Sequence, residues 1–406
     1  MTIHALPRPD GQLMAGTPEP TRPPRIGLVL TGGGARAAYQ VGALRGLAKV
    51  LGEPSAPFQI VTGVSAGAIN GCALAARANT FSDAVRDLCE LWSSLEPDSI
   101  YRTDLRGVGP VGASWIRDIL TGGHVGETRI NYLLDTTPLR QLLEKRLALE
   151  QVVERFRDGS LHGCAVTATN YATGTALTFF DGAAEIVPWQ RSTRLGIREP
   201  LTIEHVLASA AIPIFFPPIA LRGSYYGDGC IRMNAPLSPA IHLGADRIVA
   251  IGIRYFRTTE QTLVLNQPLD GTKPSIADIA GLLLNAVFLD SIEGDLERLE
   301  RINRTLALLP SGTTQPLRHV PVLALRPSED IGRMAAQQYT QLPATLRYLL
   351  SGIGATADRG WDLVSYLAFE PIYIRRLVEL GYQDTLARHR EIEQFFAAPS
   401  QASART

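Results

Sequence analysis

Two glycine-rich turns near the start of the chain, each following a short apolar run, constrain the fold more than any other feature. The first run, 25–30, is followed by three successive glycines, and the second, 58–64, leads into Gly-Val-Ser-Ala-Gly. The segments 35–51 and 66–77 follow these turns, and they have apolar residues at helical spacing or are rich in alanine. This alternation of strand and helix predicts a parallel sheet with helices on its faces.

The rest of the chain is expected to extend this sheet and to cover it. A mainly helical insertion is predicted at 94–158, a long helix at about 276–309, and further helices at 343–396. The C-terminal third is expected to complete the sheet. The proline-rich start, 1–24, and the end of the chain, 397–406, have the composition of disordered tails. Further strands are predicted at 164–169, 176–180, 247–253 and 320–325.

The sequence at 63–67 matches the Gly-x-Ser-x-Gly pattern of a nucleophile elbow. A sharp strand-to-helix turn forces its central residue, here Ser65, into a strained conformation, and it needs small neighbours such as Gly63 and Gly67. The hydroxyl group then lies at the N-terminus of a helix, whose dipole favours developing negative charge. We interpret Ser65 as a nucleophile, and the alternative is a tight turn that happens to contain a serine.

The glycine turn (Gly32, Gly33 and Gly34) lies at the end of the first predicted strand. Its backbone N–H groups are not covered by side chains and can converge on an anion. One interpretation is an oxyanion hole for a tetrahedral intermediate at Ser65, and the other is a dinucleotide-binding turn. A dinucleotide site needs an acidic residue near the end of the second strand, whereas Glu53 precedes that strand. The oxyanion hole is therefore favoured.

A nucleophilic serine needs a base, and no histidine stands in the sequence context of one. The usual α/β-hydrolase order of Ser, Asp or Glu, and then His has several strands before the elbow, but here only one strand is predicted. Asp228 is the conspicuous acid, because it lies between Gly227 and Gly229 after a predicted strand. The flanking glycines would let its carboxylate approach another backbone closely. The alternative is an aspartate that only stabilises a turn.

Four motifs in register resemble those of the patatin-like phospholipases. They are Gly-Gly-Gly-Ala-Arg at 32–36, Gly-Val-Ser-Ala-Gly at 63–67, Ala-Ser-Ala-Ala-Ile-Pro at 208–213 and Asp-Gly at 228–229. The resemblance covers about residues 26–240. It implies an α/β fold of three layers (α/β/α) with a mostly parallel central sheet, and acyl hydrolysis by a Ser–Asp dyad without histidine.

Carried over by position, the resemblance makes Ser65 the nucleophile and Asp228 its base. The amides of the glycine turn would hold the oxyanion, and Arg36 would stand close to it. A free aspartate has a pKa of about 3.9 and is a poor base for a serine hydroxyl group. We therefore expect partial burial to raise the pKa of Asp228 and a direct hydrogen bond to orient the proton transfer.

The resemblance also implies domain boundaries, and the sequence departs from the family pattern at two positions. The patatin-like catalytic domain is expected at 25–245, and the part at 246–396 is expected to complete the sheet and add helices. Ala37 stands where a glycine often follows the arginine, and Cys230 stands where a glycine or alanine often follows Asp-Gly. Both replacements are small, so the geometry is expected to survive.

The apolar segment 206–221 leads to Asp228 and suggests what the site accepts. It is predicted to be buried core or to form a wall of an acyl-chain groove beside Ser65, and one face can do both. The apolar helix at 279–289 is interpreted as a core helix, and the alternative is a lid or a lipid-docking helix. The candidates for the groove wall are Ile214, Phe215 and Phe216.

Composition and spacing exclude several other classes. The 39 basic and 39 acidic side chains give a net charge of zero without a basic block, so nucleic acid is not an expected partner. The isolated histidines and the four spaced cysteines predict no metal site, and no cofactor is implied. The proline-rich N-terminus does not read as a signal peptide, and no apolar run is long enough to span a bilayer. We expect a cytoplasmic protein with reduced cysteines and peripheral membrane contact, and the sequence predicts no oligomeric state.

Together these features predict a serine acyl hydrolase that cleaves carboxyl esters of phospholipids or lysophospholipids, in lipid catabolism or remodelling. One alternative is an esterase or thioesterase that acts on soluble acyl compounds. Another is a non-catalytic lipid-binding effector. A nucleotide-binding protein is a more remote alternative.

Overall fold

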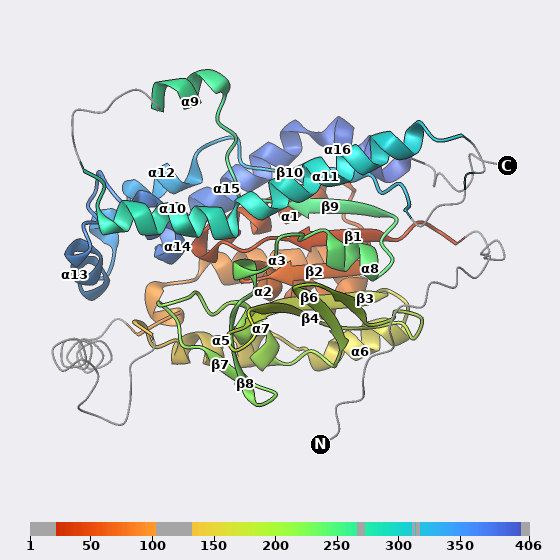
Figure 1. The fold of residues 1–406 in the computed structure, drawn as a ribbon, viewed down its shortest axis with the longest axis horizontal. Helices are drawn as coiled ribbons and strands as arrows, with labels where there is room; N and C mark the ends of the chain where they lie inside the picture. The colour runs from red at the N-terminus through yellow and green to blue at the C-terminus, as the bar shows by residue number, and fades with distance from the viewer. Residues whose placement is uncertain (1–21, 103–131, 266–272, 311–312, 314–316, 399–406) are drawn as a thin grey trace.

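The computed structural model describes residues 22–102, 132–265, 273–310, 313 and 317–398. These residues form one ten-stranded sheet in the order β10-β9-β1-β2-β3-β4-β6-β5, and β8 pairs with both β3 and β7 (Figure 1). The strands from β10 to β3 in this order run parallel, and β3 has antiparallel neighbours in β4 and β8. The strands are β1 (Ile26–Leu30), β2 (Ile60–Val64), β3 (Gly163–Asn170), β4 (Thr175–Gly182), β5 (Trp189–Arg191), β6 (Arg194–Arg198), β7 (Ile219–Leu221), β8 (Ser224–Asp228), β9 (Arg247–Ile251) and β10 (Val322–Leu325).

Helices cover the sheet, and those of the last third of the chain gather at the β9 and β10 edge (Figure 1). The helices are α1 (Ala38–Val50), α2 (Ala66–Ala76), α3 (Phe81–Ser93), α5 (Thr137–Arg146), α6 (Glu150–Arg157), α7 (Ile203–Ser209), α8 (Ser238–His242), α9 (Thr259–Leu265), α10 (Ile276–Phe288), α11 (Asp290–Ala307), α12 (Ile331–Ala336), α13 (Ala344–Gly352), α14 (Trp361–Leu367), α15 (Pro371–Ala387) and α16 (His389–Ala397).

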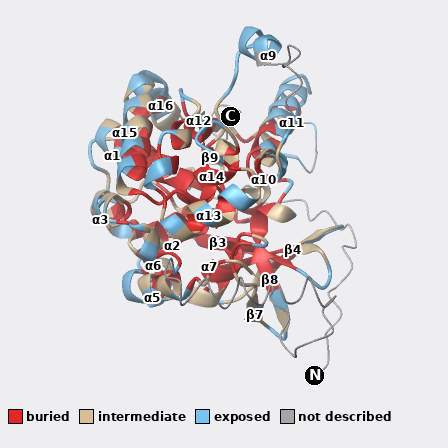
Figure 2. Ribbon diagram, turned by 90° about the vertical axis from the view of Figure 1, so that its left-hand side faces the viewer, coloured by how far each residue is buried: buried red, intermediate tan, exposed pale blue. Residues whose placement is uncertain are grey.

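Each face of the sheet has its own hydrophobic core, because successive side chains of a strand point to opposite faces. Leu28 and Leu30 of β1 belong to the larger core, which also contains side chains of α1, α2, α3 and α15. Val29 between them belongs to the smaller core, which includes side chains of α8 and α11. Figure 2 shows these buried residues in red between the paler outer helices. The predicted three-layer α/β/α fold with a mostly parallel sheet is therefore confirmed.

The predicted strands and helices of the first eighty residues are present as β1, α1, β2 and α2. The later strands at 164–169, 176–180, 247–253 and 320–325 are present as β3, β4, β9 and β10. The short strands β5 and β6 were not predicted, because they contain no run of apolar residues, and β7 was not predicted because it lies in the apolar segment 206–221 that was interpreted as buried core or a groove wall. Strands β9 and β10 both follow residue 246, and they lie beside β1 at one edge of the sheet.

The single helix expected at 276–309 is wrong, because the chain forms α10 and α11 there. The break falls at Leu289, whose φ of −109° departs from helical geometry. Asp290 and Glu293 lie in the first turn of α11, where negative side chains stabilise a new helix N-terminus. The core-helix interpretation of 279–289 is also incomplete, because Leu282 and Leu283 on the outer side of α10 are more than half exposed.

Some predictions fall outside the described residues. These are most of the two predicted tails, at 1–21 and 399–406, and the part of the predicted insertion at 103–131. Arg22 forms an ion pair with Asp246 over 2.7 Å, and α16 extends to Ala397. The described helices include none that is long and apolar enough to cross a membrane.

Candidate active site

Ser65 lies at the turn between β2 and α2, where the sequence predicted a nucleophile elbow. Its φ of 57° and ψ of −132° fall in a region that residues other than glycine rarely adopt, so the backbone is strained there. Its backbone N–H donates to the hydroxyl group of Ser209 over 2.9 Å, and its carbonyl accepts from the N–H of Ala68 over 2.8 Å. These two hydrogen bonds hold the strained turn in place.

The glycines on either side of Ser65 are required by close packing. A Cβ atom on Gly63 would lie 2.3 Å from the carbonyl oxygen of Gly67, and one on Gly67 would lie 2.4 Å from the carbonyl oxygen of Leu30. Neither contact is possible for a real side chain, because both obstacles are backbone atoms. The elbow can therefore form only where small residues flank the serine.

Asp228 ends strand β8, and the pairing of β8 with β3 brings it near the end of β2. In the strand register Asp228 lies opposite Ala168 of β3. The preceding residue of β3, Thr167, lies opposite Val64, which directly precedes Ser65. Two residues that are far apart in the sequence thus meet at neighbouring strand ends.

The carboxyl group of Asp228 is fully buried, and burial raises its pKa to about 7. The Ser65 hydroxyl group and the backbone N–H of Cys230 oppose this shift. The Cys230 N–H donates to Oδ1 over 2.9 Å, whereas Oδ2 has no hydrogen-bond partner of standard geometry. The Ser65 hydroxyl is therefore close enough to lower the pKa but is not aligned for an ideal hydrogen bond. A carboxylate with this pKa is far more basic than a free aspartate.

The segment 208–213 connects the nucleophile with the aspartate. Ser209 accepts the hydrogen bond from the backbone of Ser65 and donates its own hydroxyl hydrogen to a carbonyl of β3 over 2.6 Å. Two residues later, the carbonyl of Ala211 accepts the backbone N–H of Asp228 over 3.0 Å. The sequence marks this segment only as a motif. Its role depends on hydrogen bonds between segments that are far apart in the sequence, and such bonds cannot be predicted from a local sequence pattern.

The glycine turn touches Ser65 and has backbone geometry that suits only glycine at two positions. The φ angles of Gly33 and Gly34 are 157° and 54°. A Cβ atom on Gly32 would lie 2.8 Å from Cβ of Ser65 and 2.3 Å from Sγ of Cys230. The predicted neighbourhood of the glycine turn and the serine is therefore present, with no side chain between them.

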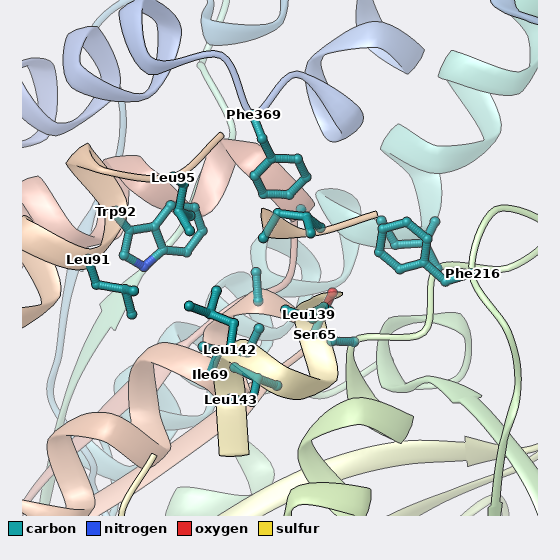
Figure 3. Close-up of a pocket in the computed structure, with 15 residues that line it drawn as sticks. Ser65, Ile69, Leu91, Trp92, Leu95, Leu139, Leu142, Leu143, Phe216 and Phe369 are labelled. Atoms are coloured by element: carbon teal, nitrogen blue, oxygen red, sulfur yellow. The ribbon is translucent and has the colours of Figure 1, made fainter. Parts of the chain in front are cut away.

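An apolar pocket opens at Ser65 between α2, α3 and α5 (Figure 3). Its empty volume is about 520 Å³, including the part open to solvent. The side chains that line it are almost entirely apolar, so it suits a hydrocarbon chain better than a polar group. They include Ile69, Leu91, Trp92, Leu143, Phe216 and Phe369.

The structure brings one of the three predicted groove residues to this pocket. Phe216 lines it, whereas Phe215 is buried elsewhere in the core and Ile214 is 62% exposed. Other walls come from α3 and from α5. Of these two helices, α5 lies within the segment 94–158 that was predicted as an insertion. No sequence pattern marked the leucines of these helices as site residues, because leucines at helical spacing are ordinary core residues.

The family model of the patatin-like phospholipases matches residues 28–241. The chain belongs to the patatin-like phospholipase family. A similar protein is the "cGAMP-activated phospholipase" of Pseudomonas aeruginosa, which is 28% identical over 214 residues. The match covers 52% of this chain and 53% of the relative, so it spans about half the length of that protein.

Two solved structures have a distant likeness to this chain. Human GIVD cytosolic phospholipase A2 has a TM-score of 0.44 at 12% identity, and the match covers 94% of this chain and 61% of that chain. VipD from Legionella pneumophila has a TM-score of 0.32 at 13% identity, and the match covers 91% of this chain and 67% of that chain.

Arg36 of the patatin-like motif directs its guanidinium group away from Ser65 and into the C-terminal third. The group donates to the Ser365 hydroxyl over 2.7 Å, to Asn285 Oδ1 over 3.2 Å and to Asp362 Oδ1 over 2.9 Å. It also lies 4.2 Å above the ring centre of Tyr366. Arg36 is near the glycine turn, as predicted, but its charged group is bound by α10 and α14. These partners lie beyond the segment that the family model matches.

The C-terminal helices also touch the glycine turn of the patatin-like part. A Cβ atom on Gly34 would lie 2.3 Å from the carbonyl oxygen of Tyr366, and one on Gly32 would lie 3.0 Å from the ring of Phe288. At the two departures from the family pattern, Ala37 and Cys230 are both buried. The backbone of Cys230 still supplies a hydrogen bond to the aspartate.

The described histidines do not line the pocket at Ser65 of this patatin-like chain. His205 lies nearest to the 208–213 motif in the sequence, but it caps α7 through Thr202 and packs against the ring of Phe179 at 4.4 Å. Two further histidines, His4 and His124, lie outside the described residues. Within the described ranges no group of three or more His, Cys, Asp or Glu side chains is placed to hold a metal ion.

Proposed function

We propose that this chain is a serine acyl hydrolase that cleaves carboxyl esters of phospholipids or lysophospholipids. The observation that carries the proposal is the arrangement at Ser65. A strained serine, a buried aspartate with a pKa of about 7 and an apolar pocket meet at one place. Family membership supports a lipid as the source of the acyl group. The site would be formed mainly by residues 25–245, with 246–396 as a supporting part.

In the proposed first step, Oγ of Ser65 attacks the ester carbonyl carbon while the Asp228 carboxylate takes the hydroxyl proton. The backbone N–H groups of the glycine turn would stabilise the negative charge that develops on the carbonyl oxygen. The tetrahedral intermediate then breaks its bond to the alcohol oxygen. The leaving alcohol takes the proton back from Asp228, and the acyl group stays on Ser65.

In the proposed second step, Asp228 takes a proton from a water molecule that attacks the acyl-enzyme. A second tetrahedral intermediate forms and releases the fatty acid, and the proton returns to Oγ of Ser65. The apolar pocket would hold the acyl chain during both steps. Because the substrate class resides in bilayers, a peripheral contact with the membrane follows from the proposal.

The first test uses a fluorophosphonate probe, which reacts covalently with an activated serine hydroxyl group. We expect the probe to label the wild-type protein at Ser65 and to leave Ser65→Ala unlabelled. Ser65→Ala should lose ester hydrolysis to background, whereas Ser351→Ala, a control at an exposed serine of α13, should keep both labelling and hydrolysis. Labelling of Ser65→Ala at wild-type level would overturn the proposal.

The second test separates the lipid hydrolase from the alternative of an esterase or thioesterase for soluble acyl compounds. Phospholipid vesicles, lysophospholipid micelles, short-chain nitrophenyl esters and acyl thioesters are compared at equal acyl concentration, and the released fatty acid is measured. Turnover of the lipids above that of the soluble compounds is expected. The reverse order would favour the soluble substrates, and labelling without any turnover would favour a lipid-binding effector.

A further inference from the structure

The pocket at Ser65, here called the acyl pocket, is followed by a second cavity along the same helices. This distal cavity has an empty volume of about 1140 Å³ and is lined by Ala73, Arg77, Leu88, Arg146 and Leu147, among others. None of these five residues lines the acyl pocket. The two cavities are therefore separate spaces in the described part of the chain.

Each of the three helices around the acyl pocket contributes lining residues to both cavities, at different positions along its length. On α2, Ile69 lines the acyl pocket, and Ala73 one turn later lines the distal cavity. On α3 the direction is reversed: Leu88 lines the distal cavity and Trp92 lines the acyl pocket, and after the helix end Leu95 lines the acyl pocket while Ser94 beside it lines the distal cavity. On α5, Leu143 lines the acyl pocket, and the residues after it line the distal cavity. The cavities thus lie end to end in one trough.

Leu91 of α3 stands at the junction, and among the described residues it alone lines both cavities. In Figure 3, Leu91 and Phe216 lie on opposite sides of the acyl pocket. The next residue, Trp92, is fixed by a hydrogen bond of 2.8 Å from its indole N–H to Asn70 of α2. Leu91 itself is only partly buried, whereas Trp92 beside it is buried.

We propose that Leu91 is the end wall of the acyl pocket and sets the acyl-chain length that the enzyme prefers. The proposal rests on the proposed function and names a specificity-determining residue for it. Two helical turns separate Ser65 from the level of Ala73, which is about 12 Å along α2. An extended chain advances about 1.2 Å per bond, and Ala73 already belongs to the distal cavity, so the acyl pocket takes a chain of at most about ten carbons.

Longer chains meet two obstacles. They must displace Leu91, and their ends then enter a cavity that contains charged side chains. Arg77 and Asp87 form an ion pair at its wall, and Glu90 and Arg146 also line it. A hydrocarbon end gains little from replacing water beside such groups. Medium-length acyl chains are therefore the preferred substrates of the wild-type enzyme.

The test compares Leu91→Ala with the wild type on nitrophenyl esters of octanoate, dodecanoate and hexadecanoate. Each methylene group that becomes accommodated raises kcat/KM by about fourfold. We therefore expect Leu91→Ala to raise the ratio of dodecanoate to octanoate turnover by at least tenfold. Leu91→Phe should lower the same ratio, because it closes the junction further.

Leu88→Ala is the matched control, since it removes the same atoms from the same helix but lines only the distal cavity. It should leave the ratio within about twofold of the wild type. An unchanged ratio in Leu91→Ala would overturn the end-wall role. So would an equal change in Leu88→Ala. In both cases ester hydrolysis itself continues, so the proposed function stands.

A binding measurement keeps the test independent of turnover. Fatty acids of the same three lengths are titrated into Ser65→Ala and into Ser65→Ala with Leu91→Ala, and the heat of binding is recorded. The second protein should bind dodecanoate at least tenfold more tightly relative to octanoate than the first. Equal selectivity in the two proteins would overturn the end wall. A wild type that hydrolyses no ester while this shift is present would instead overturn only the proposed function.

Discussion

The part of the chain up to residue 241 and the part after it contribute differently to the site. The first part supplies Ser65, Asp228 and the glycine turn, and it is the part that the family model matches. The second part supplies the partners of Arg36 and the Phe369 wall of the pocket. The groups that are proposed to react thus come from the segment that the family model matches, whereas part of their surroundings comes from the region after it.

Each part also contains a buried carboxyl group whose pKa is raised to about 7, mainly by burial. Asp228 accepts one hydrogen bond and lies at the nucleophile. Glu370, between α14 and α15, has no hydrogen-bond partner for either carboxyl oxygen. Burial of the ionised carboxylate lowers the stability of the fold at both positions, but only Asp228 lies beside Ser65. The following substitutions test this contrast, beginning with the largest expected effect.

Asp228→Asn should lower kcat by about 10²–10⁴-fold, because the amide cannot take the serine proton. The wild-type rate should rise with pH through about 7, as the carboxylate forms. The pKa of Asp228 is higher in the folded protein than its value of about 3.8 in the unfolded chain, so the folded protein holds this proton more tightly. The resulting stability is fully present below pH 3.8, and it is lost as the pH rises through about 7. Asp228→Asn should therefore be more stable than the wild type at pH 8, by about 4 kcal/mol.

Thermal unfolding and hydrolysis rates at acidic and alkaline pH measure both effects. The difference in stability should vanish in acid, where both proteins have a neutral side chain at this position. Asp358→Asn, at an exposed site, serves as the control. Near-wild-type turnover in Asp228→Asn would restore a histidine base as the better explanation.

Asp362→Asn should weaken the support of the glycine turn without touching the substrate. It removes the charge that pairs with the buried Arg36 guanidinium group over 2.9 Å. We expect kcat to fall by about tenfold while KM changes by less than about twofold, because oxyanion stabilisation is lost only in the transition state. Steady-state kinetics separate the two constants. A loss confined to KM would mean that this network acts on substrate binding instead.

Glu370→Gln should have the smallest effect on ester hydrolysis, and it should change only the stability of the fold. As the pH rises from about 4.5 to about 7, the wild type loses stability through ionisation of this buried group. The neutral amide avoids that loss, so the variant should be more stable than the wild type at pH 8 by about 3 kcal/mol and equally stable in acid. Melting curves at the two pH values measure this. A large fall in turnover would show that Glu370 has a role in the site.

The sequence reveals the groups that lie within local motifs and misses those that depend on distant contacts. Ser65 and the glycine turn could be found because strained turns demand particular residues at fixed spacing. The sheet could be predicted from its apolar runs. The partners of Arg36 could not be found, since Asn285 and Asp362 belong to helices far along the chain and look like ordinary helix residues.

The pocket was harder to predict than the reacting groups for a related reason. Leu91 and Leu143 are leucines on amphipathic helices, and only the packing of α3 and α5 against α2 gives them a shared cavity. Ile214 was expected at the groove because it lies within the apolar segment 206–221. Its side chain is exposed instead, which shows that apolar composition does not determine the direction of a side chain.

The hydrogen bonds of segment 208–213 have a consequence for the precision of the site. Ser209 holds the backbone of Ser65, and Ala211 holds the backbone of Asp228. One short segment, 209–211, therefore ties the backbone of Ser65 to that of Asp228, so a substitution that displaces this segment would disturb both residues at once.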